Sequence, residues 1–481
     1  MPAWCSAIPN TMLSPPVRST GQPRRAAWRL VSTHPLGERW RFRPVTAVHV
    51  AVTCLLIAQL GRIPLVSTGD REAPLLINDV CLLAVLGIGA LNALVSRTLI
   101  LDRASVLALL FCAVGFFSAV LAIPRYGLTI FQVAVSLAYL ARWMVYFGLY
   151  VVIINVARSR DVLALWRTLE RTILMFAAFG LVQAAFIPGF AQVVYPNGTD
   201  DWDKQGHRLV STVLEPNMAG IMIVLVLLVQ FAQFSSGGRV AGWKPSLLLA
   251  ALVATLSRSS FLALIVGGLV VLTIRGVSKR FVRFAVLGAL VLVAALPNIL
   301  SFARSYNKLR LDSSALGRLV QWARAFTVFS DHPIGGIGFN TFGFVQESYG
   351  FTRLGAGTYS TDGGLLFIAV MTGVVGLALY VGMFFLVIRR CRATWRNPTV
   401  PRELSALSIG VAAGSIALCV HSLFVNSILT TFVMEMVWLL WGLSFVIASS
   451  VSDDARLADP RPEGRQVSAV RTGQALVVTE P

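Results

Sequence analysis

The feature that most constrains this chain is a series of apolar runs, each about 17–25 residues long, the length that a helix needs to cross roughly 30 Å of hydrocarbon. Of the 481 residues, 56% are hydrophobic and 13% are charged, whereas a soluble domain carries about 25% charged residues. We therefore predict an all-α polytopic membrane protein with about twelve transmembrane helices. The predicted spans cover residues 44–61, 74–95, 104–123, 130–157, 172–190, 216–234, 244–257, 259–274, 282–299, 363–388, 405–424 and 430–449.

The distribution of basic residues sets the predicted orientation. The formal net charge is +19, and strongly basic chains often bind nucleic acid. Here, however, Lys and Arg form short patches between apolar runs, which is typical of cytoplasmic loops in membrane proteins. With the N-terminus placed inside, the patches around Arg97, Arg158, Arg239, Arg275 and Arg389 all fall on the cytoplasmic side. An even number of spans then places both termini in the cytoplasm, and no nucleic-acid partner is expected.

The extramembrane segments divide the chain into three parts. Residues 1–43, which are rich in Arg and Pro, and residues 450–481 are expected to be disordered cytoplasmic tails. They flank a transmembrane domain at 44–449. Within that domain two outer loops are long, at about 191–215 and about 300–362.

The longer outer loop contains an expected amphipathic helix at 314–329. Ser313 or Ser314 can cap it, and His332-Pro333 ends it. Such a helix could lie along the membrane surface. Its predicted apolar stripe consists of Leu316, Leu319, Val320, Ala323 and Phe326.

Cysteine and histidine residues form no metal or redox motif in this sequence. The six Cys and five His are scattered, and no Cys falls in the two long outer loops, so no disulfide framework is implied. Gly336-Ile337-Gly338 resembles a nucleotide fingerprint only superficially, because it follows a helix and Pro333 instead of a strand. We expect neither a metal nor a cofactor.

A group of basic residues departs from the charge rule, because it is predicted to face outward. Long loops tolerate any charge, so each residue taken singly can be a solvent-exposed charge without a function. Alternatively, some of them bind phosphate, since guanidinium matches phosphate oxygens bidentately and stays charged at any pH. Arg258 is the most telling, because it occupies a tight turn between two apolar spans, where an unpaired charge is expensive. The group comprises Arg208, Arg258, Arg304, Lys308, Arg310, Arg318, Arg324 and Arg353.

Among the ionisable residues within the predicted spans, four stand out: Asp79, Arg142, His421 and Glu435. Such residues are candidates for function. Asp79 and Glu435 are predicted at a similar depth near the outer surface, so Arg142 can pair with one of them. A buried ion pair that holds helices together is the favoured alternative. His421 fits a hydrogen bond between helices better than a catalyst.

The outer motifs together resemble the O-antigen ligase and polymerase superfamily. The first block is Arg208 followed by Ser211-Thr212-Val213-Leu214-Glu215-Pro216-Asn217, and the second is Leu256-Ser257-Arg258-Ser259. The third runs from Gly317-Arg318-Leu319-Val320-Gln321-Trp322 to Pro333-Ile334-Gly335-Gly336-Ile337-Gly338-Phe339-Asn340. The fourth is Asp362-Gly363-Gly364-Leu365 followed by Gly373-Val374-Val375-Gly376-Leu377. Their order, spacing and predicted side of the membrane all match over about residues 205–390.

The resemblance implies a glycosyltransferase of the bacterial inner membrane that needs no metal and no nucleotide sugar. It would use a polyprenyl-pyrophosphate-linked oligosaccharide as donor in the biosynthesis of surface polysaccharide. Arg208, Arg258 and Arg318 would hold the pyrophosphate, and the helix at 314–329 would help cover the site. Asn217, Arg142, Asp79 and Glu435 are possible supporting residues.

The sequence departs from lipopolysaccharide ligases at the end of the long outer loop. Such ligases carry a histidine just before the next span, where this chain reads Tyr359-Ser360-Thr361-Asp362. An acidic residue there looks more like the polymerases, so a polymerase is favoured over a ligase. Asp362 would orient or deprotonate the acceptor hydroxyl, or it merely caps the next helix.

Two other classes of function remain open. Twelve spans with both ends inside suit many secondary carriers, but carriers usually show two similar halves, and no repeat relates the halves of this chain. A non-catalytic scaffold of an envelope assembly is the third possibility. In that case the outer arginines should tolerate replacement by Lys or Gln.

Overall fold

The computed structural model describes residues 44–68, 71–194, 207–276, 313–351 and 360–458. Most of these residues are helical, in agreement with the predicted all-α class. The main helices are α1 (Pro44–Cys54), α2 (Ile77–Ser96), α3 (Arg103–Tyr126), α4 (Ile130–Val156), α5 (Ser159–Phe186), α7 (Pro216–Ser235), α8 (Trp243–Thr255), α9 (Arg258–Arg275), α11 (Ser313–Asp331), α13 (Gly364–Arg396), α14 (Arg402–His421) and α15 (Thr431–Ala458). Short elements complete the fold: α6 (Phe190–Val194), α12 (Phe342–Val345), the 3-10 helices η1 (Ala58–Gly61), η2 (Ser211–Val213), η3 (Gln346–Tyr349) and η5 (Ser427–Leu429), and an antiparallel hairpin of β1 (Ile63–Thr68) and β2 (Arg71–Leu75).

The long helices have the length and composition of membrane spans. Among the described residues, nine helices are long and apolar enough to cross a membrane, and α1 and α8 are shorter apolar helices. Large apolar side chains such as Leu94, Phe117 and Phe385 are exposed on their outer surfaces, as expected where lipid replaces water as the solvent. The chain is thus a polytopic membrane protein. The predicted span at 282–299 lies outside the described residues, so the count of twelve stays a prediction.

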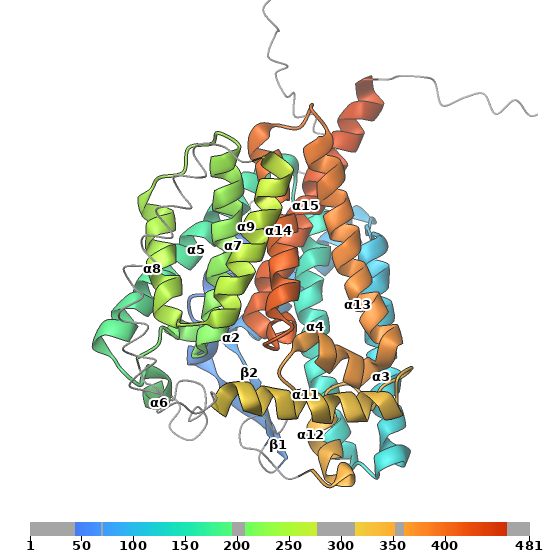
Figure 1. The fold of residues 1–481 in the computed structure, drawn as a ribbon. Helices are drawn as coiled ribbons and strands as arrows, with labels where there is room; N and C mark the ends of the chain where they lie inside the picture. The colour runs from blue at the N-terminus through green and yellow to red at the C-terminus, as the bar shows by residue number, and fades with distance from the viewer. Residues whose placement is uncertain (1–43, 69–70, 195–206, 277–312, 352–359, 459–481) are drawn as a thin grey trace, which may run out of the picture. The chain divides into compact units, whose positions relative to one another are not determined.

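Helices α14 and α15 form the centre of the bundle. In the apolar stretch of each of these two helices, 83% of the residues are buried. In α2, which lies at the periphery, only 17% are buried. Helix α14 packs against α7, α9 and α13, and α15 packs against α4 (Figure 1). The central helices therefore need complementary packing along their whole length, while α2 mainly presents apolar surface to lipid.

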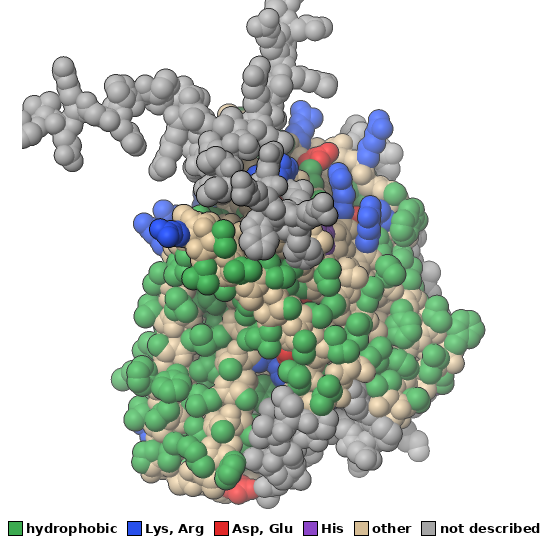
Figure 2. Space-filling model, turned by 180° about the vertical axis from the view of Figure 1, so that it is seen from behind, with side chains coloured by type: hydrophobic (Ala, Val, Ile, Leu, Met, Phe, Trp, Pro, Cys, Tyr) green, Lys and Arg blue, Asp and Glu red, His purple; other side chains and the backbone are tan. Residues whose placement is uncertain are grey.

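Helix α11 crosses one end of the bundle, roughly perpendicular to the spans (Figure 1). We call this end the α11 end. The β1–β2 hairpin and α12 lie at the same end, whereas α15 finishes at the opposite end. Seen from behind, hydrophobic side chains cover the middle of the molecule, and Lys and Arg side chains gather mainly at the end opposite α11 (Figure 2).

Several predicted boundaries were wrong. The first span, predicted at 44–61, leaves α-helical geometry after Cys54, and Ala58 in the following 3-10 turn has a φ of +41°. Helix α5 begins at Ser159 and not at 172, so Arg167 and Arg171, predicted in a loop, lie on the helix itself. The β1–β2 hairpin was not predicted. Helix α15 continues to Ala458, and so extends into the segment predicted as the C-terminal tail.

Helix α13 is broken at Gly373, where φ is +65°. The gap is filled by the backbone of residues 333–338: Val374 N donates to Pro333 O, and Ile337 N and Gly338 N donate to the carbonyl oxygens of Val370 and Met371. A Cβ at Gly373 would overlap the Ile334 carbonyl, and one at Gly336 would overlap the Met371 backbone. The glycines of the two sequence motifs are therefore required by this interlock, which also satisfies backbone groups that would be unpaired in hydrocarbon.

Candidate functional site

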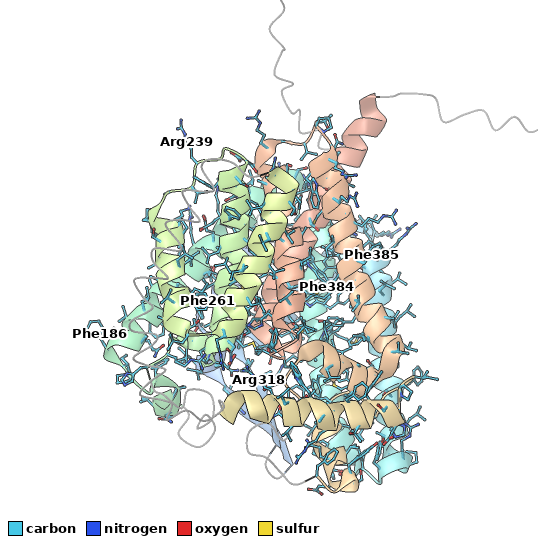
Figure 3. All side chains as sticks on the ribbon, viewed as in Figure 1. Phe186, Arg239, Phe261, Arg318, Phe384 and Phe385 are labelled. Atoms are coloured by element: carbon cyan, nitrogen blue, oxygen red, sulfur yellow. The ribbon has the colours of Figure 1, made fainter. Side chains whose placement is uncertain are left out.

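Helix α11 holds Asp362, two residues before the start of α13, through three side chains. Arg318 Nε lies 3.2 Å from Asp362 Oδ2, Gln321 Oε1 accepts from Asp362 N at 3.0 Å, and Trp322 Nε1 donates to Asp362 O at 2.7 Å. Positions i, i+3 and i+4 share one face of a helix, so the order Arg-x-x-Gln-Trp directs all three side chains at Asp362. Figure 3 shows Arg318 pointing from α11 toward the bundle.

The pair between Arg318 and Asp362 is partly open to solvent. The two side chains are 25% and 39% exposed. Burial raises the pKa of Asp362 above its usual range, and the Arg318 guanidinium only partly opposes this. Gly363 follows with a φ of +101°, and a Cβ there would lie 2.9 Å from Leu423 O. This glycine allows the backbone that follows Asp362 to pack directly against the loop after α14.

A second part of the site lies at the start of α7. The Glu215 carboxylate caps this helix by accepting from Met218 N at 2.7 Å and from Asn217 N at 3.2 Å. It also accepts from the Asn217 side-chain amide at 2.7 Å. Burial raises the pKa of Glu215 above its usual range, although the hydrogen bond from Met218 and the charge of Arg208 oppose the effect. Asn217 is thereby fixed with its amide oxygen free to accept elsewhere.

Asn217 links α7 to the turn between α8 and α9. Ser257 Oγ donates to Asn217 Oδ1 at 2.8 Å and lies 2.8 Å from Ser260 Oγ. His421 Nε2 at the end of α14 lies 3.1 Å from Ser259 Oγ and 3.2 Å from Ser260 Oγ. Its Nδ1 lies 2.9 Å from Ser427 Oγ. His421 thus joins helices by hydrogen bonds, as predicted, and it lies within electrostatic range of Arg318.

The three predicted phosphate-binding arginines all belong to this α11 end. Arg208 donates from Nε to Thr255 O at 2.9 Å, beside the turn between α8 and α9. Arg258 is the first residue of α9 and is exposed next to Ser257. Arg318 approaches from α11 and lies within electrostatic range of His421. The network from Glu215 through Asn217 and the serines around Arg258 to His421 joins the start of α7, the turn before α9 and the end of α14, and Ser257 N also donates to Thr255, beside the anchor of Arg208.

The motif segments also carry unusual backbone conformations. Six non-glycine residues in the described part of the chain have a positive φ, and four of them lie in the motif blocks. Such conformations cost about 1–3 kcal/mol each and cluster at functional sites. The four are Ser211 (+48°), Leu214 (+57°), Leu256 (+51°) and Asn340 (+55°).

The predicted helix at 314–329 is confirmed within α11, which ends at Asp331 just before His332-Pro333. Its start adjoins residues outside the described ranges, so the predicted cap at Ser313 or Ser314 is not tested. The side that faces the bundle carries Ala325 and Val328, both fully buried. Leu319, Val320 and Phe326 of the predicted apolar stripe are instead 58%, 44% and 62% exposed. These three side chains therefore face away from the bundle.

The ionisable residues predicted inside the membrane form a separate group. Arg142 pairs with Asp79 at 2.9 Å and also donates to Pro74 O. Glu435 accepts from Asn78 Nδ2 at 2.9 Å. The predicted partner of Arg142 is therefore Asp79 and not Glu435. These contacts tie α2 to α4 and α15, and the carboxylates are nearly or fully buried. We interpret the group as a brace between helices that supports the hairpin beside the site.

Sequence reasoning missed the roles of Gln321, Trp322 and the serines around Arg258. The spacing of Gln321 and Trp322 from Arg318 was a usable signal, because the three positions fall on one helical face. The hydrogen bonds of Ser257, Ser259 and Ser260 had no comparable signal, since His421 lies more than 150 residues further along the chain. Outer-loop residues Arg304, Lys308, Arg310 and Arg353 lie outside the described residues.

Residues 245–381 match the family model described as O-antigen ligase. The resemblance to the O-antigen ligase and polymerase superfamily is confirmed. The match contains Arg258, Arg318 and Asp362, whereas Arg208 and Asn217 precede it and His421 follows it. It supports a membrane-embedded enzyme that processes glycans.

The remaining comparisons add little. A solved structure described as "Structural coordination of polymerization and crosslinking by a peptidoglycan synthase complex" aligns with 73% of this chain and 97% of its own, at 20% identity and a TM-score of 0.37. A likeness this low carries no argument about function. A comparison with curated proteins finds no match.

Proposed function

We propose that this protein is a glycosyltransferase that polymerises polyprenyl-pyrophosphate-linked oligosaccharides at the outer face of a bacterial inner membrane, in surface polysaccharide biosynthesis. The observation that carries the proposal is that Arg208, Arg258 and Arg318 all belong to the α11 end, where Arg318 also pairs with the carboxylate of Asp362. The proposal places the α11 end on the extracytoplasmic side of the membrane and both termini in the cytoplasm. The excess of Lys and Arg at the opposite end supports that orientation.

The reaction that fits this arrangement is a displacement at the anomeric carbon of the donor sugar. The acceptor hydroxyl forms the new glycosidic bond, and the bond from the anomeric carbon to the pyrophosphate oxygen breaks. The electron pair leaves with the polyprenyl pyrophosphate, whose developing charge the guanidinium groups neutralise. Asp362 accepts the hydroxyl proton. Arg318 uses Nε for Asp362, and no other described residue accepts from its terminal amino groups, which suits a phosphate oxygen.

A ligase that transfers the glycan to a lipid or protein acceptor is the second candidate, favoured by the description of the matching family. Asp362 lies two residues before α13, near the end of the loop where the ligases carry histidine, and for this reason we favour the polymerase. The alternative of a transporter finds little support, because the break in α13 is filled by the protein's own backbone, whereas broken helices in carriers coordinate a substrate or ion.

The decisive experiment replaces the arginines singly in cells whose own copy of the gene has been deleted. Arg318→Ala and Arg258→Ala should each reduce polymer about 10² to 10³-fold, as loss of a group that stabilises transition-state charge does elsewhere, while the protein still inserts. The measurement is polymer amount and length on gels, normalised to protein in the membrane fraction. Arg324→Ala is the control on the same helix, because Arg324 stacks on the Phe351 ring at 5.0 Å, and it should retain polymer.

Normal polymer length and amount in both arginine variants would contradict the proposal. An equal loss in all three variants would show that general positive charge, and not position, matters.

A further inference from the structure

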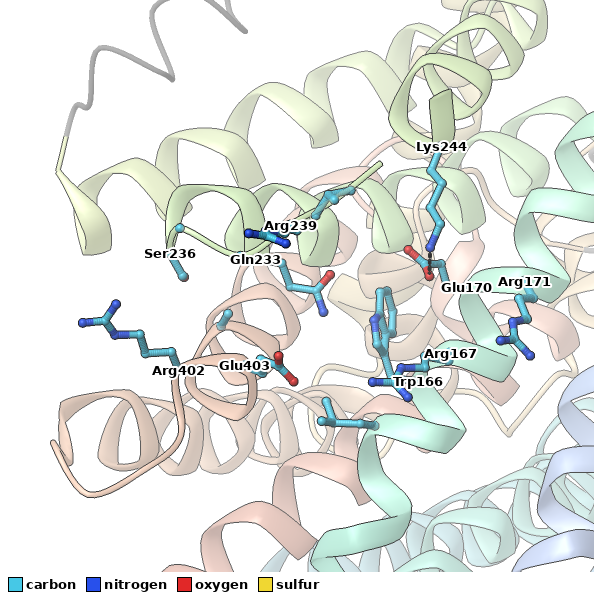
Figure 4. Close-up of a pocket in the computed structure, with 15 residues that line it drawn as sticks. Trp166, Arg167, Glu170, Arg171, Gln233, Ser236, Arg239, Lys244, Arg402 and Glu403 are labelled. Atoms are coloured by element: carbon cyan, nitrogen blue, oxygen red, sulfur yellow. Dashed lines mark hydrogen bonds and ion pairs between the residues drawn. The ribbon is translucent and has the colours of Figure 1, made fainter. Parts of the chain in front are cut away.

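A second concave site lies at the end opposite α11, far from the arginines described above. Its cavity volume is about 620 Å³. Helix α5, the end of α7, the turn into α8 and the start of α14 form its walls (Figure 4). Figure 3 shows Arg239, from this turn, and Arg318 at opposite ends of the bundle. The two sites therefore face opposite membrane surfaces.

The cavity has a strong excess of positive charge. Five cationic side chains line it, against two carboxylates, Glu170 and Glu403. Glu170 is already engaged, because it accepts from Lys244 Nζ at 2.7 Å and from Gln230 Nε2 at 2.9 Å. Four guanidinium groups then remain against Glu403 alone, and none of the four has a hydrogen bond or ion pair with another described residue. They are Arg167, Arg171, Arg239 and Arg402.

The wall of the cavity is also partly apolar. Leu163 from α5 and Val240 from the turn contribute hydrocarbon surface beside the arginines, and the nearly buried Trp166 lies behind them. A soluble anion would gain nothing from this surface, whereas the glycerol and first acyl carbons of a phospholipid would.

We propose that this cavity binds the headgroup of an anionic phospholipid from the adjacent leaflet. The phosphate is held by Arg167, Arg171 and Arg239, because guanidinium binds phosphate oxygens bidentately. Leu163 and Val240 pack against the glycerol region. Basic pockets between transmembrane helices suit such headgroups. The site is independent of the proposed transferase chemistry, so either proposal can fail without the other.

Native mass spectrometry of the purified full-length protein tests the proposal. Phosphatidylglycerol should bind more tightly than phosphatidylcholine. The triple variant Arg167→Gln/Arg171→Gln/Arg239→Gln should weaken phosphatidylglycerol binding about a hundredfold, since each basic residue near a membrane surface contributes roughly fivefold. The matched control, Arg389→Gln/Arg392→Gln/Arg396→Gln, removes three charges from the end of α13 outside the cavity and should bind as the wild type does.

Three results would overturn the proposal. Equal weakening in both triple variants would indicate a generally basic surface. Equal binding of phosphatidylcholine would remove the need for a charged headgroup, and displacement by inorganic phosphate would indicate a soluble anion as the ligand. If the triple variant does not fold, the single variant Arg239→Gln, in the turn between α7 and α8, is used to test phosphatidylglycerol binding. It should weaken binding about fivefold, and unchanged binding would count against the site.

Discussion

The two ends of the bundle each contain an arginine–aspartate pair, but the pairs are built differently. Arg390 at the opposite end meets Asp102, and both also contact Tyr150. Those two side chains are 15% and 8% exposed, against 25% and 39% for Arg318 and Asp362. In the closed pair, Arg390 and Asp102, the charges are satisfied within the protein. In the open pair, Arg318 and Asp362, the terminal amino groups of the guanidinium remain available to a ligand.

The electrostatic consequences also differ. Burial opposes ionisation of Asp102, but Arg390 and hydrogen bonds from Ser105 and Tyr150 outweigh it, so the pKa of Asp102 lies below its usual range. The pKa of Asp362 lies above its range. A fully paired carboxylate stays in its charged form, whereas the raised pKa of Asp362 makes that carboxylate easier to protonate. We propose that the strength of pairing separates structural arginines from functional ones in this fold.

The largest expected effect is on the closed pair. Arg390→Ala leaves Asp102 buried without its partner, which should cost about 3–5 kcal/mol of stability. Thermal unfolding of the purified protein in detergent measures this loss. Arg389→Ala, at the exposed neighbouring position, is the control and should change little. Polymer made per folded molecule should stay normal in Arg390→Ala, and a selective loss of activity there would break the distinction between the two pairs.

The next effect is a pH dependence set by Asp362. The carboxylate is the form that accepts a proton, so activity should fall as pH decreases through its raised pKa, at a higher pH than an ordinary aspartate near about 3.9 would give. The measurement is the initial rate against pH with the protein in liposomes containing lipid-linked oligosaccharide. Asp362→Asn should remove this acidic limb together with most of the rate. A variant that kept both would exclude Asp362 as the base.

The smallest effect concerns the support of Asp362. Trp322→Phe keeps the ring contact with Phe424 but loses the hydrogen bond to Asp362 O, a change of about 1 kcal/mol or roughly fivefold in rate. Stability should be nearly unchanged. Trp243→Phe on the exposed start of α8 serves as the control. If both variants were equally active, α11 would not position the carboxylate through this contact.

Most spans could be predicted because apolar length is a local property. Helix α7 was predicted at 216–234 and observed at Pro216–Ser235, since Pro216 fits the first helical turn and Gly237 follows the last. The first turns of α5 were missed because the alternation of Arg with apolar residues there reads as a cytoplasmic loop. The break in α13 could not be predicted, because it depends on a distant backbone segment.

The site was predicted in part for the same reason. The order of the motifs and their predicted side of the membrane placed Arg208, Arg258 and Arg318 at one end of the bundle. The ion-pair partners of charged residues could not be predicted, because they depend on tertiary structure. Asp102 and Arg390 are 288 residues apart in sequence, and both were read only as loop or cytoplasmic positions. Asp79 was a candidate partner for Arg142 because the two were predicted at similar depth in the membrane. Depth can be predicted from sequence, because it follows from a residue's position within its span.

The interlock at Gly373 bears on how the protein is made. Residues 333–338 leave the ribosome before α13 does, so the strip of backbone that fills the gap is already available when this helix is synthesised. An isolated α13 would leave the carbonyl groups of Val370 and Met371 and the amide of Val374 without these partners, at a cost of several kcal/mol each in hydrocarbon. Biogenesis of this span is therefore a folding step that involves the preceding loop, and is not a simple partition of an apolar rod into the bilayer.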